Sequence, residues 1–476
     1  YNEVDGIPCT ANPFLTNQLL RDQWGFSGFV VSDLYAIDGL MSQRVAAGRD
    51  EAGILALRSG VDSDLGGNCF SADLVRACRE GRLAEADIDR AVSRILRLKF
   101  KMGLFDNPYV KVKKAEKLIG TSGHREVARE VARQSVVLLK NENQLLPLSK
   151  EVKRVAVIGP NADNVYNQLG DYTAPQAPGS VITVLEGIRQ KLPGAEVRYV
   201  KGCAVRDTLD TSIGEACETA KNSDVVVVVL GGSSARDFET DFLETGAAVA
   251  NERKVSDMES GEGFDRIGLS LMGKQVELLK ALYATGRPVV LVMVQGRPLE
   301  LNWAAEHIPA ILTTWYPGGE GGRAIADVLF GDYNPAGRLP LSYPRHVGQL
   351  PVYYNHKSAE RHDYVEGTAA PLYPFGFGLS YTTFVYEGID VRVEGDSVRV
   401  SVDVKNVGGR AGDEVVQLYL RDEQASVVTP FMQLKAFQRV HLTSGESRRV
   451  EFVLTEEHLR VLDTSLNWRV EPGWFT

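Results

Sequence analysis

Two carboxylates that lie far apart in the chain carry the clearest chemical signal. Asp33 follows Ser32 at the end of the apolar run 29–31, and Glu262 lies between two glycines in the acidic stretch 258–266. An apolar run that ends in Ser-Asp is typical of a buried strand with an acid at its C-terminal end, where parallel barrels place catalytic groups. Two carboxylates suit the cleavage of a glycosidic bond, because one can attack the anomeric carbon while the other protonates the leaving oxygen.

Both carboxylates also have simpler interpretations. A Ser-Asp pair after a strand often caps the next helix, and a glycine-flanked acidic loop is often only solvated. Glu259, three residues before Glu262, competes for the role of the acid. Separation along the sequence does not give separation in space, so the two motifs by themselves leave these interpretations open.

Length, charge and cysteine content narrow the class of protein. The 476 residues exceed what one hydrophobic core normally organises, so we expect two or three domains. A net charge of −9 and the lack of an aromatic-basic pattern argue against nucleic acid and favour a neutral small-molecule or oligosaccharide substrate. The 5 cysteines show no metal-ligand spacing, so we expect free thiols, no metal and no cofactor. The apolar runs are too short to span a membrane.

Residues 1–100 alternate between strand and helix patterns. The apolar run 29–31 predicts a strand, 49–58 predicts a helix, and apolar residues at helical spacing predict a further helix over 85–100. Alternation of this kind is typical of parallel strands joined by helices. We therefore expect residues 1–100 to be the C-terminal part of a (β/α)8 TIM-like barrel.

Three further regions follow. Mixed, charged residues predict a linker over 101–132 that leads into a helix near 126–139. An α/β sandwich is expected over 133–373, with parallel strands and helices on both faces, because β-rich runs alternate there with helical segments; the runs are 155–158, 197–200, 225–230, 289–294 and 310–314. Short alternating runs over 374–476 predict an all-β sandwich. The fold class is thus α/β multidomain.

Seven segments, in order along nearly the whole chain, resemble the family 3 glycoside hydrolases: 1–8, 25–33, 138–141, 158–162, 260–266, 331–340 and 373–381. So many ordered matches are more specific than any single motif. The resemblance implies that the last domain is fibronectin type III-like. It also implies that both ends of the sequence are cut, with earlier barrel strands before Tyr1 and one more strand after Thr476.

The resemblance assigns roles to individual residues. Asp33 aligns with the nucleophile, which would form a covalent glycosyl ester, and Glu262 aligns with the general acid/base. Tyr1 aligns with a tyrosine whose hydroxyl would orient the nucleophile, and Ser260 with a residue near the sugar. We expect Asp265 and Arg266, in the same loop, to fix that loop by pairing.

The resemblance implies a retaining, exo-acting β-glycosidase that removes terminal non-reducing β-D-glucosyl residues. Many β-glucosidases of the family have Trp after the nucleophile, whereas this chain has Leu34, so β-xylosidase is the runner-up. Two further functions fit the same residues: a transglycosidase or phosphorylase with the same intermediate, and a non-catalytic carbohydrate-binding fragment. A homodimer is compatible with the sequence, and a periplasmic or extracellular location is favoured over a cytoplasmic one.

Overall fold

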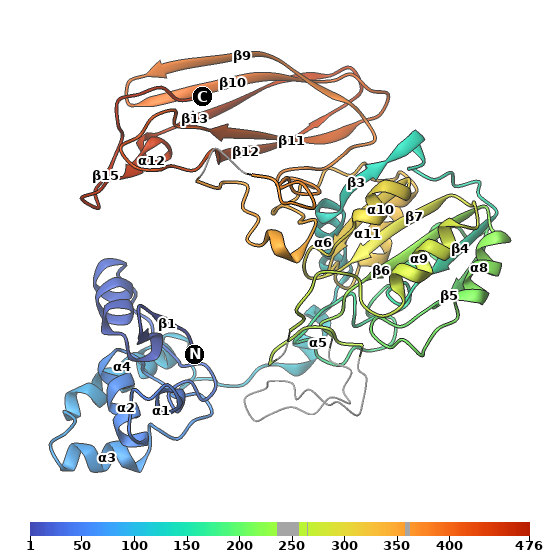
Figure 1. Cartoon of the computed structure of the whole chain (residues 1–476). Coiled ribbons are helices and arrows are strands. Elements are labelled where there is room, and N and C mark those ends of the chain that lie inside the picture. The colour runs from blue at the N-terminus through green and yellow to red at the C-terminus, as the bar shows by residue number, and fades with distance from the viewer. Residues whose placement is uncertain (236–256, 264, 358–361) are drawn as a thin grey trace. The chain divides into compact units, whose positions relative to one another are not determined.

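The computed structural model describes residues 1–235, 257–263, 265–357 and 362–476. Within these residues the chain forms two compact units, the first over Tyr1–Ile119 and the second from Gly120 onward (Figure 1). Each unit is described by itself. In the part of the chain described, no helix is long and apolar enough to cross a membrane.

The first unit is mainly helical. Its elements are β1 (Glu3–Val4), β2 (Ile7–Pro8), the 3-10 helix η1 (Cys9–Ala11), the π-helix η2 (Phe14–Gln23), α1 (Gly39–Ser42), α2 (Arg49–Arg58), α3 (Ala72–Arg79), α4 (Glu85–Lys101) and α5 (Val112–Leu118). The two helices predicted over 49–58 and 85–100 are confirmed as α2 and α4. Their apolar faces form two small cores, centred on Leu40 and Ala56 and on Leu57 and Leu74.

The predicted strand at 29–31 is shorter than expected. Among the described residues it forms a single parallel bridge between Val31 and Ser63. The amides of Asp62 and Ser63 both donate to the carbonyl of Val30, at 2.8 and 3.1 Å. Two segments therefore run side by side in the same direction, as in a parallel sheet, but they pair over too few residues to count as a full strand.

The helix expected near 126–139 ends earlier. Helix α6 spans Ser122–Ser135 and is followed at once by strand β3 (Val137–Asn141), so the placement of 137–139 in a helix was wrong. The residues Val137 to Leu139 are buried and pair with another strand, which satisfies their backbone groups in an apolar environment. Helices α5 and α6 occupy much of the region expected as a linker.

The second unit contains a six-stranded sheet in its described residues, with the order β3-β8-β7-β6-β4-β5. All five predicted β-rich runs lie in it; the strands are β4 (Arg154–Ile158), β5 (Glu196–Val200), β6 (Val225–Gly231), β7 (Val289–Val294) and β8 (Ala310–Trp315). These five are parallel, as expected. The edge strand β3 pairs with β8 in the antiparallel direction, which the alternating pattern did not predict.

Helices cover both faces of this sheet. Apolar side chains at alternate positions of β6 enter two different cores, one containing Val226 and Val228 and the other Val225 and Val227. The helices on the first core are α8 (Ile213–Lys221), α9 (Gln275–Tyr283) and α10 (Asn302–His307). The helices on the second core are α7 (Val184–Lys191) and α11 (Gly321–Leu329). Two short 3-10 helices are η3 (Glu142–Gln144) and η4 (Val347–Gln349). Burial of such alternating valines stabilises the sheet from both sides.

The C-terminal region is a β-sandwich. One sheet has the order β13-β10-β9 and the other pairs β11 with β12; the elements are β9 (Phe384–Glu394), β10 (Ser397–Asn406), β11 (Gly412–Leu420), β12 (Gln433–Leu442), β13 (Ser447–Leu454), α12 (Glu456–Leu459), β14 (Val461–Leu462) and β15 (Trp468–Arg469). Val404, Val416 and Phe452 lie in the core between the sheets. An ion pair of 2.7 Å from Arg338 to Glu414 ties the sandwich to the preceding sheet region.

The order of strands creates a switch point in the large sheet. From β4 the chain goes to β5 on one side, then crosses to β6 on the other side of β4. The loops that leave β4 and β6 therefore start from neighbouring strand ends and diverge. In open α/β sheets, ligands bind at such a place, outside the carboxyl ends of the strands.

Candidate active site

Asp33 lies at the C-terminal end of the paired segment in the first unit. Its side chain is exposed, and its Oδ1 accepts a hydrogen bond of 2.6 Å from the amide of Leu34. The next helix, α1, begins at Gly39, with Asp38 at its N-terminal boundary. Asp33 therefore does not cap a helix, which removes the simpler interpretation of the Ser-Asp pair.

A buried acid fixes the segment that leads to Asp33. The carboxylate of Asp62 accepts hydrogen bonds from the amide of Val30 at 2.9 Å and from Arg21 and Arg94 at 2.7 and 2.8 Å. Ser32 adds a second link, since its hydroxyl accepts from the amide of Leu65 at 2.9 Å. Charge-assisted bonds of this kind are stronger than neutral ones, so the backbone before Asp33 is firmly positioned.

Tyr1 lies beside the same segment. Its hydroxyl donates to the backbone carbonyl of Leu34, the residue after Asp33, and its own carbonyl accepts from Gln43 at 2.9 Å. The structure thus brings Tyr1 to the segment of Asp33 through a contact with the backbone.

Glu262 lies in the second unit, in the loop that follows β6. The hydroxyl of Tyr172 donates to its Oε2 at 2.5 Å. Tyr172 comes from the loop after β4, so the contact joins the two loops that diverge at the switch point. Tyr172 has a φ of +58°, a left-handed conformation that costs free energy in a residue other than glycine and that clusters at functional sites.

Sequence reasoning missed Tyr172. The available signal was its position, because Tyr172 follows Gly170-Asp171 in the long connection between a predicted strand, 155–158, and the next helix. Ligand-binding residues concentrate on such loops, but the loop has many polar side chains and the pattern does not select one. Only the tertiary contact with Glu262 distinguishes Tyr172 from the other polar side chains of this loop.

Glu259, the rival acid, is buried and paired. Its side chain is 4% exposed, and Arg266, itself 6% exposed, bonds to its Oε2 at 2.7 Å. Burial raises the pKa of Glu259, although the neighbouring Arg266 charge opposes that rise. Ser260, the next residue, is also buried. Glu259 is thus an anchor of the loop with little access for a substrate.

Asp265 and Arg266 fix the loop by pairing, as expected. Arg266 also donates to the carbonyl of Gly268 at 2.7 Å and to that of Ser270. Asp265 pairs with Arg297 at 2.9 Å. Burial raises the pKa of Asp265, but hydrogen bonds from Arg297 and from the Arg266 amide outweigh it and hold that pKa below its ordinary value.

A chain of buried polar groups underlies the two loops. Asn161, after β4, donates to the carbonyl of Gly232, after β6, at 3.1 Å. Asn167 donates to Asn161 Oδ1 at 2.8 Å, and the hydroxyl of Ser233 donates to Asn167 Oδ1 at 2.7 Å. Because these groups are buried, breaking one bond leaves another polar group unsatisfied, so the network rigidifies the base of both loops.

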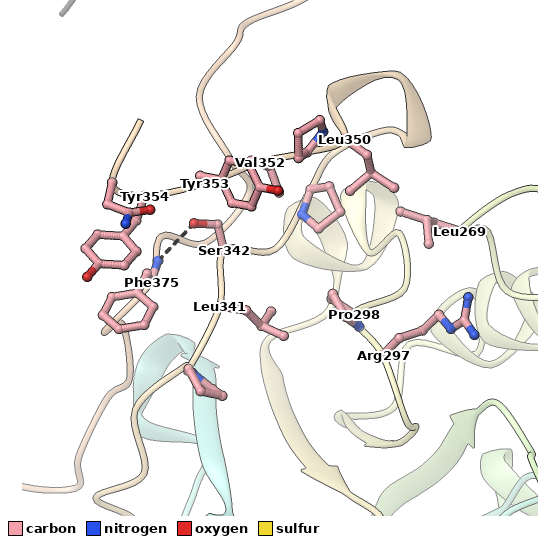
Figure 2. A pocket seen from close by; sticks show the side chains of 14 residues that line it. Leu269, Arg297, Pro298, Leu341, Ser342, Leu350, Val352, Tyr353, Tyr354 and Phe375 are labelled. Carbon is pink, nitrogen blue, oxygen red and sulfur yellow. Dashed lines mark hydrogen bonds between the residues drawn. The ribbon is translucent and has the colours of Figure 1, made fainter. Parts of the chain in front are cut away.

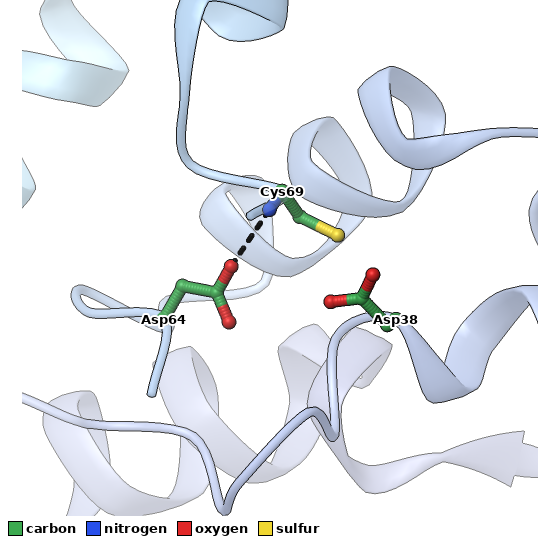
Figure 3. A group of neighbouring side chains, drawn as sticks. All are labelled: Asp38, Asp64 and Cys69. Carbon is green, nitrogen blue, oxygen red and sulfur yellow. Dashed lines mark hydrogen bonds between the residues drawn. The ribbon is translucent and has the colours of Figure 1, made fainter. Parts of the chain in front are cut away.

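The first unit also holds three potential cation ligands close together. Single ligand atoms of Asp38, Asp64 and Cys69 lie within 4.8 Å of one another (Figure 3). Burial, followed by a hydrogen bond to Asp38, raises the pKa of the Cys69 thiol to about 12, so the thiol is protonated at neutral pH. Asp64 accepts from the Cys69 amide at 2.8 Å. These contacts explain the cluster as a structural link between the loops that follow the two paired segments.

Asp33 and Tyr1 belong to the first unit, whereas Glu262 and Ser260 belong to the second. Within each unit the structure supplies an acid on a positioned segment, together with a tyrosine that contacts that segment. The sequence matches the glycosyl hydrolase family 3 N-terminal domain over residues 1–98, the family 3 C-terminal domain over 136–381, and a fibronectin type III-like domain over 414–476.

The chain belongs to glycosyl hydrolase family 3. A β-xylosidase of Formosa agariphila is 40% identical to it over 505 residues, which cover 100% of this chain and 66% of the relative. A periplasmic β-glucosidase of Salmonella typhimurium is 37% identical, with 100% of this chain and 64% of the relative covered. This family 3 chain spans about two thirds of the length of these curated relatives.

Solved structures agree on the fold. The crystal structure of a β-glucosidase from Listeria innocua in complex with glucose is similar to this chain, with a TM-score of 0.86 and 34% sequence identity. The similarity covers 100% of this chain and 64% of that one. The family 3 fold, with several domains and mixed sheets, is therefore common to both.

Proposed function

We propose that this family 3 chain is part of a retaining, exo-acting β-glycosidase that hydrolyses terminal non-reducing β-D-glucosyl residues of oligosaccharides or glucosides by double displacement. The observation that carries the proposal is Glu262, held by Tyr172 on a loop whose base is anchored by buried polar groups. The exposed Asp33 carboxylate, on its own positioned segment, is the natural second group.

In the first step, Asp33 attacks the anomeric carbon from the face opposite the leaving group and forms a covalent glycosyl ester. Glu262 donates its proton to the glycosidic oxygen as the bond breaks, so the leaving group departs as a neutral alcohol. The Tyr172 hydroxyl, 2.5 Å from Oε2, orients the carboxyl group for this transfer.

In the second step, the Glu262 carboxylate takes a proton from water, and that water attacks the anomeric carbon and releases Asp33. Two inversions return the β configuration. Glu259 is unsuited to this exchange because its carboxylate is occupied by Arg266 and excluded from solvent. We assign Tyr1 and Ser260 to substrate binding, Tyr1 beside the nucleophile and Ser260 beside the acid.

We assign residues 1–100 to the C-terminal part of a TIM-like barrel, 101–132 to a linker, 133–373 to the α/β sandwich and 374–476 to the fibronectin type III-like domain. The parallel bridge between Val31 and Ser63 supports the first assignment, because adjacent parallel strands are the repeating element of a barrel.

β-Xylosidase activity by the same mechanism is the second candidate. It is favoured by Leu34, which stands directly after the candidate nucleophile and offers no indole surface to the sugar, and by the named β-xylosidase relative. The Salmonella relative named as periplasmic supports a periplasmic or extracellular location.

The test uses the full-length protein with 4-nitrophenyl β-D-glucoside and 4-nitrophenyl β-D-xyloside, with the first sugar product followed by proton NMR. We expect the β anomer to form before mutarotation, and faster from the glucoside. An α anomer would contradict retention, and a sugar phosphate formed in added phosphate would identify a phosphorylase. Lack of release from either substrate would favour a binding role.

A further inference from the structure

The second unit contains an apolar pocket beside the loop that carries Glu262. Its volume is about 540 Å³, within the range of pockets that hold small molecules. Figure 2 shows side chains from three separate segments around it, among them Leu269, Arg297, Leu350, Tyr353, Tyr354 and Phe375. The pocket therefore has walls from the loop after β6, the loop after β7 and the segment that leads to the β-sandwich.

The loop of Glu262 itself builds one side of this pocket. Leu269 lies seven residues after Glu262 and is buried, and Arg266 holds the turn around it by bonds to the carbonyls at 268 and 270. Arg297, on the pocket wall, pairs with Asp265. Two residues lie between Glu262 and Asp265, so the Cα atoms of the two acids are within about 11 Å of each other.

The charge and surface of the pocket select its ligand. The only described positive group on its wall, Arg297, is neutralised by Asp265 through contacts of 2.9 and 3.1 Å. Phe375 stacks on Tyr354 with ring centroids 4.0 Å apart, and Tyr353 is 63% exposed. A neutral surface with aromatic faces favours a flat, apolar ligand, because ring contacts bury much area and aromatic pairs add to it.

The position of the pocket indicates which part of a substrate would reach it. A general acid protonates the leaving oxygen, so the leaving group must lie on the side of Glu262. We propose that this pocket binds the leaving group of the substrate, and that the preferred leaving group is aromatic; the inference rests on the proposed function. The specificity of the enzyme for its leaving group is then set in the second unit by Tyr353 and Leu350.

The experiment compares 2-naphthyl and methyl β-glycosides of the sugar that the full-length protein hydrolyses. The readout is kcat/KM for the 2-naphthyl glycoside divided by kcat/KM for the methyl glycoside. The intrinsic reactivity of the two leaving groups affects this ratio equally in every variant, so it cancels when variants are compared. Tyr353→Ala and Leu350→Ser change side chains that are 63% and 50% exposed, so both proteins should fold. Tyr109→Ala, at an 83% exposed tyrosine outside the pocket, is the matched control.

We expect the ratio to fall about fivefold or more in each pocket variant and to stay at the wild-type value in Tyr109→Ala. An unchanged ratio in active Tyr353→Ala and Leu350→Ser proteins would overturn the inference. If the wild type cleaves neither glycoside, the proposed function is wrong, and this result leaves the pocket to be tested without catalysis. Fluorescence titration with 2-naphthol then decides the pocket alone: binding weakened by Tyr353→Ala supports it, and no binding to the wild type overturns it.

Discussion

At the scale of single residues, the loop after β6 carries two acids, and their positions in the sequence do not show which of them is the general acid. Glu259 and Glu262 are three residues apart, yet one is buried against Arg266 and the other meets Tyr172 at 2.5 Å. Removing a buried acid that is paired with an arginine destabilises the fold, whereas we propose that Glu262, which accepts from the Tyr172 hydroxyl, acts on the substrate. Mutation of Glu262 should therefore lower activity, whereas mutation of Glu259 should lower stability.

We expect Glu262→Gln to lower kcat/KM for a methyl glycoside by about 10²–10⁴-fold, because it removes general acid/base catalysis, with no change in thermal stability. Glu259→Gln, the matched variant, should lower the free energy of unfolding by about 3–5 kcal/mol, because Arg266 loses its buried partner. Paired assays of activity and thermal melting check both. A stable Glu259→Gln protein without activity, beside an active Glu262→Gln protein, would reverse the assignment.

Tyr172 is the second residue-scale test. Tyr172→Phe removes only the hydroxyl that donates to Glu262, so we expect kcat to fall about two- to tenfold, with KM nearly constant. Tyr364→Phe, at another exposed tyrosine of the same unit, should leave both constants unchanged. A Tyr172→Phe protein with wild-type kcat would show that the contact with Glu262 has no part in catalysis.

At the scale of elements, the strand ends below the loops need glycine. A Cβ at Gly231 would lie 1.8 Å from the carbonyl oxygen of Val294, and the φ of Gly231 is +142°. We expect Gly231→Ala to lower the free energy of unfolding by at least about 2 kcal/mol, since it forces β6 away from β7. Gly194→Ala, where a Cβ meets open space, should change it by less than about 0.5 kcal/mol.

Urea denaturation of both variants checks this expectation. Equal midpoints for the two variants would contradict the close approach of β6 and β7 at Gly231.

A buried acid also joins three helices of the second unit. Asp327, in α11, is fully buried and bonds to Arg129 and Arg133 of α6 and to Lys191 of α7. Burial raises the pKa of Asp327, but the hydrogen bonds from Lys191, Arg133 and Arg129 outweigh it and hold that pKa below its ordinary value. The stabilisation is therefore complete above about pH 4 and is lost as pH falls through the lowered folded-state pKa.

Asp327→Asn should lower the free energy of unfolding at pH 7 by about 3–5 kcal/mol, and this difference from the wild type should shrink below about pH 4. Glu196→Gln, which breaks an exposed pair with Arg198, should cost only about 0–1 kcal/mol. Urea unfolding at several pH values measures both. A pH-independent difference for Asp327→Asn would contradict a charged Asp327.

The elements show how far the sequence predicts this fold. Runs such as 225–230 and 289–294 are continuous and β-branched, so they predict buried parallel strands correctly. The strand β3 was misread because a short apolar run after a helix fits either element, and only its pairing with β8 decides. The burial of Glu259 and the contact of Tyr172 depend on residues distant in sequence, and no local pattern contains them.

At the scale of the whole molecule, we propose that the catalytic groups are divided between the two units. The first unit supplies Asp33 and Tyr1, and the second supplies Glu262, Tyr172 and the apolar pocket. The family 3 models match part of each unit, over residues 1–98 and 136–381.

Covalent trapping of the full-length protein with a 2-deoxy-2-fluoro β-glycosyl fluoride, followed by peptide mapping, tests directly whether Asp33 is the nucleophile. We expect one fluorosugar per chain, linked to the peptide that contains Asp33, and no label in an Asp33→Asn protein. Labelling of a peptide that contains Glu262 or Glu259 instead, or rapid turnover of aryl glycosides by Asp33→Asn, would contradict this assignment.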